Sequence, residues 1–365
     1  MKVLITGGAG FIGSNLVDHF IEQGHEVVCL DDLSTGFEHN ISHHFGSPKF
    51  TFIKGDIRDK EKCRKAVDGC DYISHQAALG SVPRSLTDPA NTNSVNIDGF
   101  LNILIAARDA KVKRFVYAAS SSTYGDSKKL PKVEEEIGKP LSPYAITKYV
   151  NELYADVFSK TYGMQCIGLR YFNVFGKRQD PNGPYAAVIP FWVKSLIKHE
   201  KPLINGDGSY SRDFTYIENV IQANEKALFT STEEIHKGQK EYCNIEIDVH
   251  KHLPQPNEHL VLENHNEAKI PPLPDNFNFF SEVFNIAYGG NTTLLQLYRA
   301  LCENLSKYDD EIRKIEPEFG PFRAGDIPHS QAGILKAKTI IGYEPKVDAL
   351  EGFSKVSKWY YDNLT

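Results

Sequence analysis

The stretch Gly7-Gly8-Ala9-Gly10-Phe11-Ile12-Gly13 joins a short apolar run, Val3-Leu4-Ile5, to a helical pattern that continues to Gln23. Its glycines repeat as G-x-x-G-x-x-G. This spacing suits a tight turn whose bare backbone can touch a diphosphate and let a helix pack closely on a strand. The following helix would direct free N–H groups and the positive end of its dipole at those phosphates. The stretch therefore predicts a strand, a phosphate-binding turn and a helix.

Residues at the ends of the next strands extend this prediction to a dinucleotide. Asp31 ends the second apolar run, at the spacing from the glycines where a carboxylate binds the adenosine ribose hydroxyls. The same carboxylate would repel a 2′-phosphate, so the pattern favours NAD over NADP. Residues 55–57 and 76–78 follow the third and fourth runs, at strand ends where such a ligand lies.

Short apolar runs alternate with helical patterns up to about residue 170. Runs that are apolar on both faces suit buried parallel strands, and their alternation with helices indicates a doubly wound α/β sheet. The expected strands are residues 3–5, 27–30, 50–53, 72–74, 115–119 and 166–169, and the expected helices include 13–23, 60–67 and 95–110. Beyond Gly176 this alternation stops, so we expect a Rossmann domain followed by a smaller C-terminal lobe.

Residues 230–282 differ from the rest of the chain, because they are polar and rich in Asn, His, Glu and Pro. Within them, residues 242–249 alternate strictly between apolar and polar side chains, as a half-buried strand does. The sequence of residues 254–257 is typical of a turn, and residues 260–262 could form a returning strand. We expect an ordered surface insertion that contains a β-hairpin.

The composition excludes several classes of protein. The chain has 365 residues, with 41 Lys and Arg against 47 Asp and Glu, and 41% of its residues are hydrophobic. This globular, mildly acidic mixture argues against a disordered chain and against a nucleic-acid partner. The six cysteines are scattered without a Cys-x-x-Cys pair, so we expect reduced thiols in a cytoplasmic protein, and no metal site. Neither a signal peptide nor a membrane-spanning run is expected.

The segment Ser142-Pro143-Tyr144-Ala145-Ile146-Thr147-Lys148 carries the candidate chemistry. Ser142 suits a helix N-cap and Pro143 the first helical position, so Tyr144 and Lys148 are predicted to share one helix face. A tyrosine with a pKa near 10 is a poor base at neutral pH. A nearby ammonium and a cationic nicotinamide ring would both favour the phenolate and lower that pKa. After a dinucleotide site, this pair predicts a tyrosine general base.

A run of hydroxyl residues, Ser120-Ser121-Ser122-Thr123, ends the fifth expected strand. Such hydroxyls can bind a substrate oxygen and relay its proton, or they can simply end the strand and cap the next turn. Neighbouring residues of a strand point to opposite faces, so the pattern alone leaves open which serine points inward.

These motifs, together with Asp56-Ile57 and Leu169-Arg170-Tyr171-Phe172-Asn173-Val174-Phe175-Gly176, resemble the extended short-chain dehydrogenase/reductase family. More narrowly, the chain resembles the nucleotide-sugar 4-epimerases. Residues 137–144 and 177–183 look closest to bacterial UDP-N-acetylglucosamine 4-epimerases of surface-polysaccharide pathways. The resemblance covers nearly the whole chain except residues 230–282.

The resemblance implies a mechanism and a division into lobes. Tyr144 would take the proton of the sugar 4-hydroxyl while C4 gives a hydride to tightly bound NAD, and the 4-keto sugar would receive it back on its other face. Lys148 would hold the nicotinamide ribose, and Ser120 or Ser121 would assist the proton transfer. Residues 1–176, rejoined by 213–229 and 283–296, would form the NAD-binding domain, and residues 177–212 and 297–365 the UDP-sugar lobe. The family is generally dimeric through paired helices, so a homodimer is expected.

By motif position, the resemblance also assigns binding residues. Cofactor binding is expected from Gly7, Gly10, Phe11, Ile12, Gly13, Asp31, Asp32, Ser34, Thr35, Gly36, Asp56, Ile57, Gln76, Ala77, Ala78, Ser94, Tyr144, Lys148, Tyr171 and Val174. Substrate binding is expected from Gly80, Ser81, Ser122, Tyr144, Asn173, Ala187, Val188, Leu203, Asn205, Arg212, Arg323, Asp326 and Ser330. The fork of an arginine suits a diphosphate, although Arg212 and Arg323 taken singly could be surface charges.

Ser330 is the sequence feature that bears on substrate choice. A tyrosine at its position resembles enzymes restricted to UDP-glucose and UDP-galactose, whereas a small residue leaves room for an N-acetyl group. Gly80 and Ala187 are likewise small. We therefore expect interconversion of UDP-N-acetylglucosamine and UDP-N-acetylgalactosamine, with UDP-glucose and UDP-galactose as further candidates.

Three other functions compete with this one. A UDP-glucuronic acid 4-epimerase would share the Tyr–Lys core and differ in how C6 is bound. A 4,6-dehydratase would need an Asp–Glu pair just after the strand-end hydroxyl, but this chain has Ser120-Ser121-Ser122-Thr123 there and no carboxylate, which argues against it. A non-catalytic NAD-binding Rossmann protein would usually lack the Tyr–Lys pair.

Overall fold

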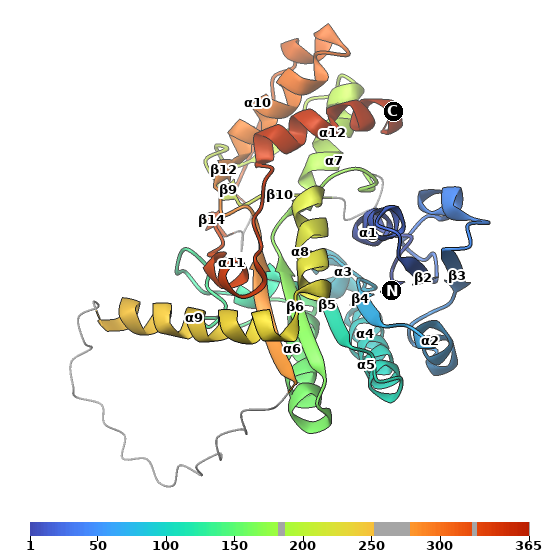
Figure 1. The fold of residues 1–365 in the computed structure, drawn as a ribbon. Helices are drawn as coiled ribbons and strands as arrows, with labels where there is room; N and C mark the ends of the chain where they lie inside the picture. The colour runs from blue at the N-terminus through green and yellow to red at the C-terminus, as the bar shows by residue number, and fades with distance from the viewer. Residues whose placement is uncertain (182–186, 252–277, 323–326, 365) are drawn as a thin grey trace.

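The computed structural model describes residues 1–181, 187–251, 278–322 and 327–364 (Figure 1). A seven-stranded sheet lies at its centre, and every neighbouring pair of strands in it is parallel. From one edge to the other, the strands are β11 (Phe280–Ile286), β6 (Gln165–Tyr171), β5 (Arg114–Ser120), β4 (Tyr72–His75), β1 (Lys2–Thr6), β2 (Glu26–Asp31) and β3 (Phe50–Lys54). The strand order reverses between β1 and β4, which is the switch point of a doubly wound fold. The predicted fold class is confirmed.

Two sets of helices cover the two faces of this sheet. α1 (Phe11–Glu22) and α8 (Ile217–Phe229) contribute to one apolar core, whereas α2 (Lys60–Val67), α5 (Phe100–Asp109) and α6 (Pro143–Tyr162) contribute to another. In β1, Val3 and Ile5 belong to the first core and Leu4 to the second. Both faces of the strand are buried, which explains why its sequence is continuously apolar.

Further helices and strands connect the strands of the sheet and follow it along the chain. The further helices are α3 (Val82–Thr87), α4 (Pro89–Asn93), α7 (Val188–Ile197), α10 (Leu294–Leu305), α11 (Leu335–Ile341) and α12 (Ala349–Asn363). The further strands are β7 (Val174–Phe175), β8 (Leu203–Asn205), β9 (Ser211–Arg212), β10 (Thr215–Tyr216), β12 (Thr292–Thr293), β13 (Glu318–Gly320) and β14 (His329–Ser330). Single turns of 3₁₀ or π helix occupy Glu38–Asn40, Ser42–His44, Ser94–Gly99, Ser121–Tyr124 and Asp310–Lys314. Figure 1 shows α7, α10 and α12 together above the sheet.

The strand predicted over residues 242–249 is wrong, because these residues belong to helix α9 (Thr232–Lys251). Ser231 and Glu234 form a capping box at its start: the Ser231 hydroxyl accepts from Glu234 N–H and the Glu234 carboxylate accepts from Ser231 N–H. Ile235, Gly238 and Tyr242 then lie at helical spacing against the body of the protein, with Gly238 on the backbone of Ile340 in α11. The contacts of this helical face stabilise a helix even though residues 242–249 alternate between apolar and polar side chains as a strand does.

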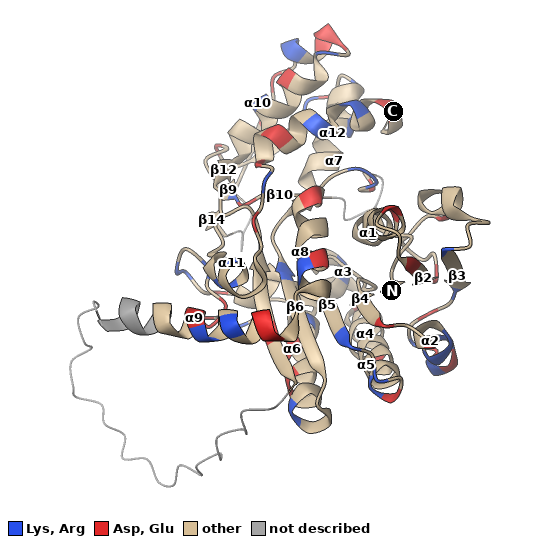
Figure 2. Ribbon diagram, viewed as in Figure 1, with Lys and Arg blue, Asp and Glu red and all other residues tan. Residues whose placement is uncertain are grey.

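α9 extends outward from the sheet, as Figure 1 shows, and Cys243 on it is exposed. The predicted turn at residues 254–257 and the returning strand at 260–262 lie outside the described residues. β11 starts at Phe280, before the point where the chain was expected to rejoin the sheet. Figure 2 shows basic and acidic residues interspersed along α9 and α12. Among the described residues, no helix has the length and apolar character needed to cross a membrane.

Candidate active site

A cavity of about 450 Å³ opens beyond the carboxyl ends of β1, β2, β3 and β4. Its lining includes many of the residues predicted to bind the cofactor, namely Gly7, Gly10, Phe11, Ile12, Gly13, Asp31, Asp32, Ser34, Thr35, Asp56, Ile57, Gln76, Ala77 and Ala78. Three residues predicted to bind the sugar nucleotide also line it, namely Gly80, Ser81 and Ala187. The structure thus brings together side chains from four strand ends and from the start of α7.

The glycine turn packs so closely against its neighbours that Gly7 and Gly13 leave no room for a side chain. Gly7 adopts φ +67°, and a Cβ there would lie 2.7 Å from the backbone nitrogen of Ala77. A Cβ on Gly13 would lie 2.1 Å from the carbonyl oxygen of Gly7. Gly10 forms the N-cap of α1 and has no side chain to bond the first N–H groups of that helix. These N–H groups are therefore available to a diphosphate in the cavity.

Asp31 is one of the acidic residues that line this cavity, and hydrogen bonds from the backbone orient its side chain. Its side chain is buried and accepts hydrogen bonds from Ala9 N–H at 2.9 Å and from Leu33 N–H at 2.8 Å. Burial raises the pKa of Asp31, while these two bonds oppose that rise. Each oxygen keeps a free acceptor position, which suits two vicinal ribose hydroxyls. The donor set and the bare glycine backbone therefore fit NAD.

Six residues predicted to bind the cofactor do not line this cavity, namely Gly36, Ser94, Tyr144, Lys148, Tyr171 and Val174. Tyr171 donates a hydrogen bond to the Gln76 side chain at 3.3 Å and accepts one from Asn224 at 2.9 Å. A Cβ on Gly36 would lie 2.8 Å from the carbonyl carbon of Ala9, so Gly36 packs on the glycine turn. Ser94 begins the π-helical turn whose Val95 lines the cavity, and Val174 lies on β7.

Tyr144 and Lys148 lie on the first turns of α6, as predicted. The Ser142 hydroxyl caps this helix by accepting from Ala145 N–H at 3.1 Å, and Pro143 occupies its first turn. Lys148 is buried, and its Nζ donates to the carbonyl of Ala118 at 2.7 Å. The same Nζ lies 6.0 Å from the centre of the Tyr144 ring. The strand end of β5 thus fixes the ammonium beside the tyrosine.

The protonation of this pair responds to burial. Burial lowers the pKa of Lys148 to about 8, and the charge of Glu152 opposes that decrease. Burial raises the pKa of Tyr144, and a hydrogen bond with the Ser120 side chain opposes that rise. A cation beside the phenol favours its ionised form. Tyr144 therefore depends on Lys148 and on a positively charged ligand to act as a base near neutral pH.

Of the three serines, Ser120 is the one whose side chain reaches Tyr144. Its hydroxyl accepts from both the N–H and the hydroxyl of Ser122, at 3.1 and 2.9 Å. The Thr123 hydroxyl donates a hydrogen bond to the carbonyl of Ser120 at 2.8 Å, and this bond holds the turn Ser121–Tyr124 close to the end of β5. Ser121 is half-buried in that turn. The geometry therefore favours Ser120 for the proton relay.

The residues predicted to bind the UDP-sugar are spread over several short elements. Ser330 on β14 lies opposite Arg212 on β9, and the Arg212 guanidinium donates to the carbonyls of Ser211 and Pro328. Asn173 donates to the carbonyl of Asp213 at 3.1 Å. The remaining positions are Ser122 in the serine turn, Val188 at the start of α7, and Leu203 and Asn205 on β8. Arg323 and Asp326 lie outside the described residues.

The cavity is also lined by Gly55, which the sequence placed at a strand end, and by residues that the sequence reasoning missed: Leu30, Leu79, Arg84, Val95, Gln179 and Asp180. Asn96 is a further omission, because it holds the chain after β4 in place. Its amide bonds the backbone of Leu79 and the hydroxyl of Thr147 on α6. Position after a strand end could have indicated Leu79 and Arg84, whereas the bond between Asn96 and Thr147 joins segments far apart in the sequence.

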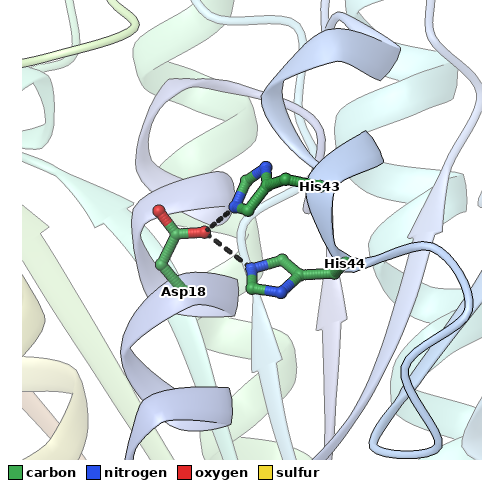
Figure 3. Close-up of side chains that lie close together, drawn as sticks. All are labelled: Asp18, His43 and His44. Carbon is green, nitrogen blue, oxygen red and sulfur yellow. Dashed lines mark hydrogen bonds and ion pairs between the residues drawn. The ribbon is translucent and has the colours of Figure 1, made fainter.

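A cluster of two histidines and an aspartate lies beside α1 (Figure 3). His43 and His44 each approach one carboxylate oxygen of Asp18, at 2.9 and 2.8 Å. The other oxygen of Asp18 contacts Arg178 at 2.8 Å and Lys177 at 3.8 Å. A divalent cation here would meet two fixed positive charges, so we interpret the cluster as a structural link. It ties α1 to the segment that leads to Gln179 and Asp180.

Comparison with known proteins agrees with this geometry. Residues 3–240 match the family described as "NAD dependent epimerase/dehydratase family". The chain is 33% identical to a UDP-N-acetylglucosamine 4-epimerase of Methanobrevibacter ruminantium, solved with UDP-N-acetylmuramic acid, with a TM-score of 0.80 and coverage of 99% and 98% of the two chains. It is also 33% identical to a UDP-glucose 4-epimerase of Thermotoga maritima, solved with UDP-glucose, with a TM-score of 0.78 over 100% of both chains.

A third similar structure is described as the 4-epimerase of a different sugar nucleotide. The chain is 26% identical to a UDP-glucuronic acid 4-epimerase of Bacillus cereus, solved with UDP-glucuronic acid and NAD, with a TM-score of 0.75 and coverage of 100% and 99%. The three similar structures therefore share the 4-epimerase description and differ in the group that their sugars carry.

Proposed function

The chain belongs to the NAD dependent epimerase/dehydratase family, and from this we propose that it is a UDP-sugar 4-epimerase that interconverts UDP-N-acetylglucosamine and UDP-N-acetylgalactosamine. The observation that carries the proposal is the arrangement of Tyr144, Lys148 and Ser120. A phenol, a buried ammonium and a hydroxyl lie together at the end of β5, and the neighbouring strand β4 ends at the cavity that suits NAD. This is the set of groups that moving a hydride and a proton at one alcohol carbon requires.

In this mechanism, NAD supplies a reversible acceptor for the C4 hydride. Tyr144 would take the proton of the sugar 4-hydroxyl when C4 is oxidised, and would return it to the same oxygen when C4 is reduced on its other face. Lys148 holds a positive charge near the phenolate, anchored by the Ala118 carbonyl. Ser120 hydrogen-bonds Tyr144 and accepts a hydrogen bond from the Ser122 hydroxyl, so it can orient the sugar oxygen or relay the proton of that oxygen.

Small residues at three positions support the N-acetylated substrate. Ser330, Gly80 and Ala187 all have short side chains, and a Cβ on Gly80 would find no atom within 4 Å. Open space at these positions would admit an acetamido group at C2. UDP-glucose and UDP-galactose would fit the same space with fewer contacts. UDP-glucuronic acid remains the second candidate, because an enzyme described as its 4-epimerase shares this fold at 26% identity.

Product analysis of separate incubations tests the proposal. UDP-N-acetylglucosamine, UDP-glucose and UDP-glucuronic acid should be incubated with the NAD-loaded protein, and the products resolved by chromatography. We expect UDP-N-acetylgalactosamine from the first, and a loss of turnover by about 10³-fold or more in Tyr144→Phe, which keeps the ring but removes the base. Rapid turnover of UDP-glucuronic acid with none of the N-acetylated substrate would establish the second candidate instead.

We further propose that the enzyme is a homodimer through α6. Ile146, Leu153 and Val157 on α6 are about half exposed, and they recur at the i, i+7, i+11 spacing of one helical stripe. Val82 and Leu86 on α3, which packs beside α6, are also exposed. An apolar surface of this kind on a folded protein is typical of a protein–protein interface.

A further inference from the structure

We propose that Arg170 and Glu152 are positioning residues of the active site: their ion pair holds α6 against the serine turn, and it neutralises a carboxylate one helical turn from Lys148. This inference rests on the proposed function, because it concerns how the same Tyr–Lys site is held and charged. Neither residue lines the cofactor cavity.

The ion pair is buried and bidentate. Arg170 Nε lies 2.9 Å from Glu152 Oε1, and Arg170 Nη2 lies 2.8 Å from Glu152 Oε2. The side chains are 4% and 6% exposed. Two parallel N–H···O bonds fix the distance and the angle between the planar groups. Arg170 belongs to β6 and Glu152 to α6, so the pair sets how the catalytic helix sits on the sheet.

The third nitrogen of Arg170 extends this link to the serine turn. This nitrogen, Nη1, donates to the Tyr124 hydroxyl at 3.0 Å and to the backbone carbonyl of Glu134 at 3.1 Å. Tyr124 ends the turn Ser121–Tyr124, and its hydroxyl donates to Asn285 on β11 at 2.6 Å. One guanidinium therefore contacts the helix that carries Tyr144 and Lys148 and the turn that follows Ser120.

The pair also affects the charge at Lys148. Glu152 lies four residues after Lys148, on the same face of α6, and its charge raises the pKa of that lysine against the larger effect of burial. The other titratable groups facing Lys148 are Tyr144 and His75, and the latter is held neutral because burial lowers its pKa to about 3. Tyr117, Tyr124 and Glu134 surround the ion pair itself.

Stability alone accounts poorly for this arrangement. A buried ion pair often contributes no more to stability than well-packed apolar residues would, because both charges lose their hydration. Removing only one partner leaves an uncompensated charge in the interior. Without Arg170, the full charge of Glu152 would act on Lys148 and keep it protonated to higher pH. Without Glu152, the positive charge of Arg170 would disfavour the protonated form of Lys148 and lower its pKa.

The test uses the opposite signs of these two effects. Glu152→Gln, Arg170→Gln and the double variant should be prepared with ¹³C at the ε carbon of lysine. The Lys148 resonance can be assigned by its loss in Lys148→Met and titrated by NMR. We expect its titration midpoint, near pH 8 in the parent, to fall by roughly one pH unit in Glu152→Gln and to rise by a similar amount in Arg170→Gln. The double variant should return close to the parent.

Turnover measured alongside should show the alkaline limb of the pH profile moving with the NMR midpoint, and kcat should fall about 10-fold or more in the single variants as α6 shifts. Arg114→Gln is the matched control: Arg114 is also buried, but it donates to carbonyls in the last turn of α8 and just after it, so its loss should leave the Lys148 midpoint unchanged. Midpoints that do not move, or that move in the same direction in both single variants, would overturn the inference. If Arg170→Gln does not fold, the inference is judged by whether the Lys148 midpoint falls in Glu152→Gln. Titration as expected without any UDP-sugar turnover would refute the proposed function and leave the pairing intact.

Discussion

Ser330 lies directly opposite Arg212 in the parallel pair formed by β14 and β9. His329 is in turn opposite Ser211, and the two side chains share a hydrogen bond of 2.8 Å. The register between the strands is therefore held by a side-chain contact as well as by the backbone. The residue proposed to admit the acetamido group sits across from the arginine proposed to bind the diphosphate.

This register makes Ser330→Tyr a test of substrate choice. A tyrosine side chain would fill the space beside the sugar, so we expect kcat/KM for UDP-N-acetylglucosamine to fall about 100-fold while that for UDP-glucose changes by less than about fivefold. Ser330→Ala serves as the matched control, since it stays small and should retain both activities within a fewfold. Equal losses on both substrates in the tyrosine variant would contradict the assignment of this position.

Gly13→Ala should damage the cofactor turn. The new Cβ would lie 2.1 Å from the Gly7 carbonyl oxygen, and this backbone contact can be relieved only by moving the turn away from α1. We expect the free energy of unfolding to fall by about 1–3 kcal/mol and NAD affinity, measured by calorimetry, to fall at least about 10-fold. For comparison, Gly80→Ala places a methyl group where no atom lies within 4 Å, so its unfolding free energy should match the parent within about 0.5 kcal/mol.

Glu134 should make stability depend on pH. Burial raises the pKa of its carboxyl group to about 7, from a usual value of 4.5, although Asn285 N–H and Lys336 oppose the rise. The folded state therefore binds a proton that the unfolded state has already released, and stability falls as pH rises from about 4.5 to 7. Over that interval the contribution of this group is up to roughly 3 kcal/mol.

Glu134→Gln should remove that dependence, because the amide keeps an acceptor for Asn285 N–H and does not ionise. Urea unfolding at pH 5 and pH 8 measures it: the parent should lose more stability between the two pH values than the variant does. A constant difference between the two proteins across this range would show that Glu134 titrates at its ordinary pKa.

Leu153→Asp should dissociate the proposed dimer. Leu153 is 49% exposed on α6, so a charge there costs the isolated chain little but would be buried without a partner in a dimer. Sedimentation should give a mass near 41.0 kDa for the variant and twice that for the parent. Leu350→Asp on α12 is a control with similar exposure, and it should sediment as the parent does. A parent that sediments at the mass of one chain would refute the dimer.

Much of the sheet could be predicted from the sequence because each strand is buried on both faces. Val3-Leu4-Ile5 is apolar throughout, and the glycine turn follows shortly after it. This combination strongly favours a buried parallel strand. α6 could be located as well, since Ser142 and Pro143 give a strong helix start. α9 could not, because the alternation of residues 242–249 has the period of a strand, and the burial of Ile235 and Tyr242 against α11 depends on tertiary contact.

The site divides in the same way. Glycines and Asp31 are tied to a local turn, so their place at the cavity follows from their position in the sequence. Which serine reaches Tyr144 depends on the 3₁₀ turn after β5, which folds Ser122 back onto Ser120. Gln179 and Asp180 line the cavity next to Arg178, which forms an ion pair with Asp18. Because Asp18 and Arg178 are far apart in the sequence, no local sequence pattern could have predicted this contact.

The exposed position of Cys243 on α9 has a practical consequence. The other five cysteines are buried, and burial raises the pKa of Cys63 and Cys166 to about 12, so that few of their thiols are ionised near neutral pH. Thiol-reactive dyes attack the thiolate, so on the folded protein they should label Cys243 first. The native chain thus carries a reporter position on helix α9, which extends outward from the sheet, and fluorescence measurements there need no added cysteine.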